Sequence, residues 1–157
     1  MAFINVSGKS DIGIKKWEYT TAAGWMLERL AGKRLASKIE LNIKLVPSLY
    51  KIEKKIGDCE WKDDNIRPRE FIIRIDSSRK KKIQLHTLAH ELVHVKQFAR
   101  GELYDYIYDH KTRWKRQKYD NPFKMSHDQY MNLPWEVEAY KLESIIYNEW
   151  INRDENK

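Results

Sequence analysis

The sequence predicts one α+β domain with a small three-stranded sheet, mixed or antiparallel, and three main helices. Residues 38–46 alternate apolar and polar side chains, the pattern of a strand with one buried face. Residues 69–76 are rich in Ile and Phe and predict another strand, and a long helix is expected directly after it over residues 81–100. Together these patterns favour an α+β fold built from few, separate elements.

The remaining strand and the first helix are predicted from weaker patterns. An imperfect apolar stripe indicates a helix over residues 15–31, which Gly32 can end. Residues 56–62 are plausible as the strand between the other two, with a polar loop after it. The charged residues that flank the strand at residues 69–76 favour a place at a sheet edge.

The last part of the chain combines an irregular insert with a helix. Gly101 can close the long helix, and residues of about 104–133 show few regularly spaced apolar positions. Within them, residues 113–119 predict a small hairpin. Pro134 suits a first helical turn, so we expect a final helix over residues 134–151.

The amino-acid composition limits the classes of protein to which the chain can belong. The chain has 157 residues, 41% of them hydrophobic, and includes six Trp, nine Tyr and four Phe, which is enough for one globular domain over residues 1–157. The apolar runs are too short to span a membrane, and residues 1–6 do not look like a signal peptide. We therefore expect a cytoplasmic protein. Cys59, as a single cysteine, excludes an internal disulfide and a cysteine-rich zinc site and is expected to be an inert apolar residue.

The net charge of +7 favours contact with nucleic acid or acidic proteins. The basic residues are scattered, with residues 79–82 as the densest run, so the sequence favours a solvated basic surface over specific binding of nucleic acid. Nucleic acid is therefore an alternative partner, beside a peptide or protein substrate.

The clearest chemical pattern lies inside the long helix. His90, Glu91 and His94 form an HExxH motif. Residues four apart share one helix face, so both imidazoles can reach one ion. Zinc binds imidazole nitrogen at about 2.0–2.1 Å, and a catalytic zinc site leaves a position open for water. An ordinary helix with hydrogen-bonded histidines is the alternative, but the apolar surroundings suit a rigid, buried site.

Glu91 follows the first histidine directly and is predicted to act as the catalytic base. It would take a proton from zinc-bound water during hydrolysis of a peptide bond and pass the proton to the leaving amine.

A zinc site with two histidine ligands needs a third ligand from the protein. The metzincin position for that ligand is held by Arg100, which cannot bind a metal, and the glycine of that motif is replaced by Gln97. His86 precedes the motif, but it lies about 12 Å along the helix axis from His94, too far to share one ion. The third ligand must therefore lie further along the chain.

The start of the last helix resembles the gluzincins, HExxH peptidases whose third ligand is a glutamate on a downstream helix. Glu136, Ala139 and Tyr140 match the register of that helix, with Tyr140 where an Asp or Asn is more usual. The resemblance implies Glu136 as the third zinc ligand. Glu138 is the alternative, and His110 or His127 would follow if neither glutamate binds.

The order of elements also resembles minimal gluzincins and the SprT-like group, and the motifs are similar to uncharacterised metallopeptidases encoded by phages. The resemblance implies a zincin-like fold, and an edge strand at residues 69–76 that binds the substrate backbone. Two further hypotheses stay open: a DNA-associated SprT-like protein, and a zinc-stabilised scaffold without activity. Oligomeric state and substrate are not predicted.

Further side chains of the insert are candidates for stabilising the oxyanion of the tetrahedral intermediate, or are loop residues without a catalytic role. They are Arg113, Tyr119, His127 and Tyr130. Trp114 and Trp135 either line a substrate pocket or belong to the core.

Overall fold

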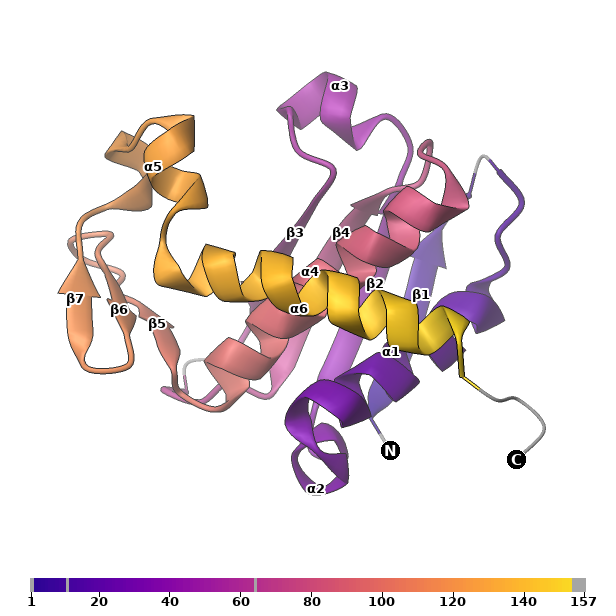
Figure 1. Ribbon diagram of the computed structural model, residues 1–157, viewed down its shortest axis with the longest axis horizontal. Helices are drawn as coiled ribbons and strands as arrows, with labels where there is room; N and C mark the ends of the chain where they lie inside the picture. The colour runs from indigo at the N-terminus through magenta and orange to yellow at the C-terminus, as the bar shows by residue number, and fades with distance from the viewer. Residues whose placement is uncertain (1, 11, 64, 154–157) are drawn as a thin grey trace.

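The computed structural model describes residues 2–10, 12–63 and 65–153, which form a mixed α+β fold (Figure 1). Its larger sheet has the strand order β1-β2-β4-β3. These strands are β1 (Phe3–Gly8), β2 (Glu40–Val46), β4 (Glu70–Asp76) and β3 (Gly57–Trp61). The first three are parallel to one another, and β3 is antiparallel to β4. The main sheet is therefore mixed, as the sequence allowed.

Three long helices cover one face of this sheet. They are α1 (Lys16–Ala31), α4 (Lys81–Ala99) and α6 (Pro134–Ile151). Helix α4 contacts β3 and β4 directly, α1 packs beside it, and α6 crosses both helices from outside (Figure 1). Helix α4 is thus enclosed between the sheet and α6, and most of its residues from Leu85 onward are buried. It is the element on which a rigid site can be built.

Two expectations about the sheet are wrong. The sequence predicts three strands, but β1 adds a fourth by pairing with β2. The strand at residues 69–76 is not at the edge, because β4 lies between β2 and β3. Its charged Arg74 points away from the helices and is held by Glu53 and Asp58, while Phe71 and Ile73 are buried on the helix side. The charged residues of β4 therefore lie on the solvated face of the sheet and do not mark an unpaired edge.

The insert contains more regular structure than expected. Strands β5 (Leu103–Asp105), β6 (Thr112–Trp114) and β7 (Gln117–Tyr119) form a small antiparallel sheet that includes the predicted hairpin. The 3-10 turn η1 (Pro122–Lys124) and the short helix α5 (His127–Met131) follow. Two other short helices are α2 (Lys33–Ala36) and α3 (Leu49–Glu53). The insert folds over the start of α6.

Strand β3 lies unusually close to α4 at Gly57. A Cβ atom there would stand 2.4 Å from Cγ2 of Thr87 and 2.9 Å from the carbonyl oxygen of Arg74. It would also lie 3.5 Å from Oε1 of Glu91. Only glycine permits this approach, which places the beginning of the edge strand beside the expected catalytic base.

Within the described ranges, we find no helix whose length and hydropathy would let it cross a membrane.

Candidate metal centre

Helix α4 carries the HExxH motif on the side that faces α6. The buried side chains of Leu88, Leu92 and Val95 hold the helix in the core, so the motif sits on a rigid element. The side chains of His90 and His94 are only 13% and 10% exposed. Their Nε2 atoms lie 3.2 Å apart, as expected for residues one helical turn apart on one face.

Glu136 meets these two imidazoles from the first turn of α6. Its Oε2 lies 3.2 Å from Nε2 of His90, and its Oε1 lies 3.2 Å from Nε2 of His94. The carboxylate side chain is 3% exposed. Among the described residues, His90, His94 and Glu136 are the group of three side chains that could hold a metal ion.

The geometry and the donor set fit zinc. Two ligands of a tetrahedral zinc ion lie roughly 3.3 Å apart when each bond is about 2.0–2.1 Å. The two imidazole Nε2 atoms, 3.2 Å apart, match that value. Glu136 meets the two rings through different oxygens, each 3.2 Å from one Nε2 atom, and one ligand atom from each residue lies within 4.8 Å of the others. Two imidazoles and one carboxylate also form the donor set of catalytic zinc sites, in which a fourth position is left for water.

Glu138, the second glutamate considered as third ligand, points elsewhere. Its Oε1 accepts hydrogen bonds from Nζ of Lys96 at 2.9 Å and from Nε2 of Gln97 at 3.1 Å. Lys96 also pairs with Glu102 at 2.9 Å. Glu138 therefore belongs to an ion-pair network beside the cluster and is not part of the cluster. His110 and His127 are both exposed in the insert and do not join the cluster either.

The charged groups of the cluster strongly shift the pKa values of one another. Burial alone would raise the pKa of Glu136, but hydrogen bonds with His90 and His94 lower that pKa well below its usual range. Burial alone would lower the pKa of His90, but the carboxylates of Glu136 and Glu143 raise it to about 10. The carboxylates around the two imidazoles therefore favour positive charge in the place where a cation would bind.

Glu91 lies next to the cluster in a dry environment. It is 6% exposed, and burial raises its pKa, an effect that the charges of His94 and His90 partly offset. A carboxylate with a raised pKa accepts a proton more readily near neutral pH. This environment suits the role of general base that the sequence predicts.

Glu143 is a carboxylate of the site that sequence reasoning missed. Its Oε1 lies 3.8 Å from Nδ1 of His90, and its Oε2 lies 4.0 Å from Nδ1 of His86. Tyr140 packs its ring against His90, with the centroids 4.7 Å apart, while its hydroxyl contacts Met131. Glu143 follows Glu136 by seven residues, two helical turns on one face, and that spacing was the available signal.

Tyr130 is the one oxyanion candidate that reaches the cluster. Its hydroxyl donates a 2.9 Å hydrogen bond to Oε1 of Glu136, although the residue as a whole is 38% exposed. Tyr119 instead packs edge-on against Trp135, and Arg113 lies over the ring of Tyr104. Trp114 and Trp135 are buried in the core.

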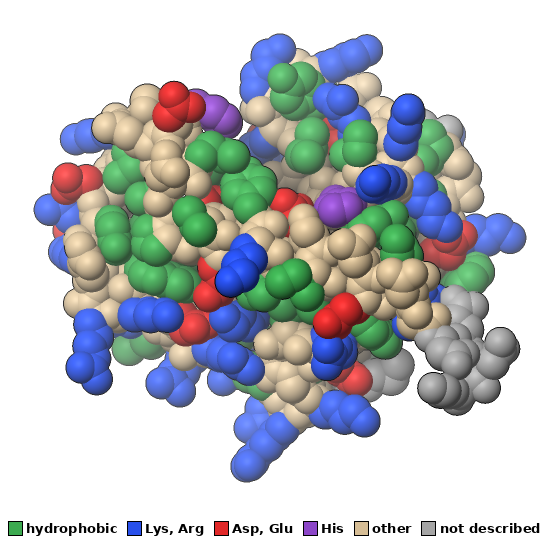
Figure 2. All heavy atoms as spheres, in the orientation of Figure 1, with side chains coloured by type: hydrophobic (Ala, Val, Ile, Leu, Met, Phe, Trp, Pro, Cys, Tyr) green, Lys and Arg blue, Asp and Glu red, His purple; other side chains and the backbone are tan. Residues whose placement is uncertain are grey.

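A hollow crosses one face of the molecular surface. Figure 2 shows it between the regions of α5 and α3, with acidic and histidine side chains in its floor and hydrophobic side chains along its walls. The basic side chains are spread over several parts of this face and do not gather into one patch.

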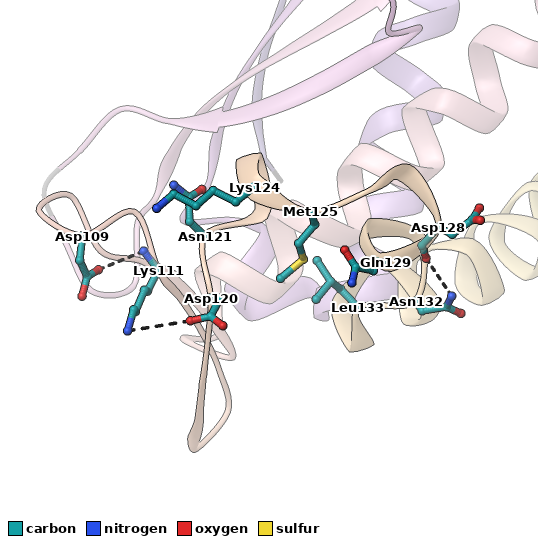
Figure 3. A pocket seen from close by; sticks show the side chains of 10 residues that line it. All are labelled: Asp109, Lys111, Asp120, Asn121, Lys124, Met125, Asp128, Gln129, Asn132 and Leu133. Atoms are coloured by element: carbon teal, nitrogen blue, oxygen red, sulfur yellow. Dashed lines mark hydrogen bonds and ion pairs between the residues drawn. The ribbon is translucent and has the colours of Figure 1, made fainter.

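A separate cavity of about 780 Å³ lies in the insert, between the small sheet and α5 (Figure 3). Its walls carry charges of both signs, including Lys111, which pairs with Asp120 at 3.9 Å. None of the three clustered side chains lines it. The cavity is thus distinct from the candidate metal centre.

In the comparisons with known proteins, no family model, no curated protein and no solved structure matches this chain.

Proposed function

We propose that the protein is a zinc-dependent metallopeptidase. The observation that carries the proposal is the convergence of His90, His94 and Glu136 at separations of 3.2 Å, with the buried carboxylate of Glu91 on the same helix. A zinc-stabilised scaffold would explain the three ligands, but it has no use for a second buried carboxylate beside them. The resemblance to gluzincins supports the same function.

Zinc held by these three side chains would acidify a water molecule towards a pKa of about 7 and polarise the scissile carbonyl. Glu91 removes a proton from the water as its oxygen forms a bond to the carbonyl carbon. Glu91 then returns that proton to the amide nitrogen as the carbon–nitrogen bond breaks, so the products are a carboxylate and an amine. The charge that develops on the carbonyl oxygen needs a hydrogen-bond donor.

Tyr130 is the donor that the contacts favour. Its hydroxyl lies within one hydrogen bond of a carboxylate oxygen that is itself 3.2 Å from Nε2 of His94. A small rotation of the phenol would aim it at a substrate oxygen beside the same ligands. Such a donor acts where charge develops and is therefore most effective in the transition state.

The substrate backbone would align with β3, since this strand and not β4 ends the described sheet beside α4. An extended peptide pairs with an exposed edge through main-chain hydrogen bonds, which give affinity without strong sequence preference. The close approach at Gly57 brings that edge to within contact distance of Glu91.

The test is zinc content measured together with hydrolysis. We expect about one zinc per chain, removal by a strong chelator, and cleavage of members of an unbiased peptide library that is lost with the zinc and restored by adding it back. Zinc-independent cleavage, or a chain that binds no zinc, would overturn the proposal.

A further inference from the structure

Gln97 is a fully buried side chain at the cluster that is not one of its expected ligands. It lies on α4, three residues after His94, and its exposed fraction is 0%. Its Oε1 is 2.8 Å from Nδ1 of His94. Its Nε2 lies 3.0 Å from the carbonyl oxygen of Trp135 and 3.1 Å from Oε1 of Glu138.

These partners determine the orientation of the Gln97 side-chain amide, that is, which of its two terminal atoms is the oxygen. A carbonyl oxygen and a carboxylate oxygen only accept hydrogen bonds, so the Gln97 atom that faces them must be the NH₂ group. The oxygen of Gln97 then faces His94, and it can only accept. Nδ1 of His94 must therefore carry the proton in this hydrogen bond, which leaves Nε2 as the nitrogen with a lone pair for a metal.

We propose that Gln97 is the positioning residue of the metal centre, holding His94 in the tautomer and ring orientation that bind zinc. The proposal rests on the proposed function, since it concerns a ligand of that site. Imidazole ligands generally donate their second N–H to an acceptor, and loss of this acceptor weakens metal binding about 10- to 100-fold.

The same amide also joins the two helices that supply the ligands. Trp135 and Glu138 both belong to α6 and lie on either side of Glu136 in the sequence. Gln97 therefore ties the first turn of α6 to the ring of His94, and it sets the distance between that ring and the carboxylate of Glu136. His90 has no comparably close partner at Nδ1 among the described residues, because Glu143 stands 3.8 Å away.

Helix α4 offers a matched control for this role. Gln84 is also fully buried, and its Nε2 donates to two backbone carbonyl oxygens, those of Ser77 at 3.2 Å and Arg79 at 2.6 Å. Its Oε1 has no hydrogen-bond partner among the described residues, so no histidine depends on it. Gln84→Met therefore also removes two donated hydrogen bonds from a buried glutamine of α4, without touching His94.

The experiment compares zinc affinity in the parent, Gln97→Met and Gln84→Met. Methionine keeps the volume of glutamine but provides no acceptor of comparable strength. We expect Gln97→Met to raise the zinc Kd about 10- to 100-fold, and Gln84→Met to leave it unchanged at a similar loss of thermal stability.

A second measurement needs no metal. In ¹⁵N-labelled protein, the Nδ1 proton of His94 should exchange slowly in the metal-free parent and in Gln84→Met, and it should lose this protection in Gln97→Met. Equal zinc affinity in Gln97→Met and the parent, or an unchanged Nδ1 signal in Gln97→Met, overturns the proposal. If the parent binds no zinc, the proposed function fails, while the Nδ1 signal still decides whether Gln97 holds His94.

Discussion

The hydroxyl of Tyr130 donates a 2.9 Å hydrogen bond to Oε1 of Glu136, which joins α5 to the candidate metal centre. The contact brings a phenol from the insert to a site that is otherwise built entirely on α4 and α6. The role proposed for Tyr130 can therefore be tested separately from metal binding.

Tyr130→Phe removes this donor and keeps the ring. We expect kcat for peptide hydrolysis to fall about 100-fold, because a donor to the developing oxyanion is lost, while zinc content changes little. Tyr140→Phe is the control, since its hydroxyl contacts Met131 and only its ring packs on His90. Equal loss of activity in both variants would assign the effect to a general disturbance of the packing around the candidate metal centre.

The third ligand is tested by comparing Glu136→Ala with Glu138→Ala. We expect a much larger loss of zinc affinity for Glu136→Ala, because Glu138 contributes only through Lys96 and Gln97. His90→Ala and His94→Ala should abolish tight binding. Equilibrium titration against a zinc-binding dye measures all four. A larger loss for Glu138→Ala would move the ligand, and no loss in either would point to His110 or His127.

Glu91→Gln separates catalysis from metal binding. The substitution keeps the shape of the side chain and removes its basicity, so zinc content and folding should stay close to those of the parent. Hydrolysis should fall at least about 100-fold, the usual effect of losing a general base. Equal cleavage by both proteins, measured on a peptide that the parent cuts, would contradict the mechanism.

Asp58, which is not part of the cluster of His90, His94 and Glu136, is predicted to make stability depend on pH. Burial alone would raise the pKa of Asp58, but hydrogen bonds from Arg74 and Lys55 lower it below 3.8, the value expected for an unfolded chain. The folded state then binds the proton less tightly, so this stabilisation is present above about pH 4 and is lost as the pH falls through the folded pKa.

Asp58→Asn should therefore cost about 1–2 kcal/mol at pH 7, and the difference from the parent should shrink towards pH 3. Denaturant unfolding at several pH values measures it. Asp109→Asn is the control, since Asp109 pairs with Lys118 at an exposed position, and we expect little change. A difference that stays constant between pH 7 and pH 3 would exclude the Arg74 pair as its cause.

Gly57→Ala is expected to destabilise the protein and to reduce hydrolysis, because the added Cβ meets Thr87 at 2.4 Å and pushes β3 away from α4. Overpacking of this kind typically costs about 1–3 kcal/mol. Gly24→Ala is the matched control. Gly24 lies inside α1, and its Cβ would make an ordinary contact of 3.6 Å with Cδ1 of Ile4 in β1, so stability should stay equal or rise. Thermal unfolding compares the two variants, and equal stability of both would refute the close approach.

Local sequence patterns were sufficient for most elements and for the core of the site. Helix α4 and the spacing of His90 and His94 were predictable, because a helical period places residues four apart on one face whatever surrounds them. The alternating pattern of β2 was equally clear, since one face is buried. Strand β1 was missed because its residues are mostly exposed and its strand character comes from pairing with β2.

Tertiary structure alone decided what depends on contacts between distant segments. The place of β4 inside the sheet follows from its partners on both sides, which its charged residues concealed. The choice between Glu136 and Glu138 depends on how α6 is rotated against α4, and side chains two residues apart on a helix point in different directions. The roles of Gln97, Tyr130 and Glu143 arise in the same way, because each touches a residue whose position only the packing of α4, α5 and α6 determines.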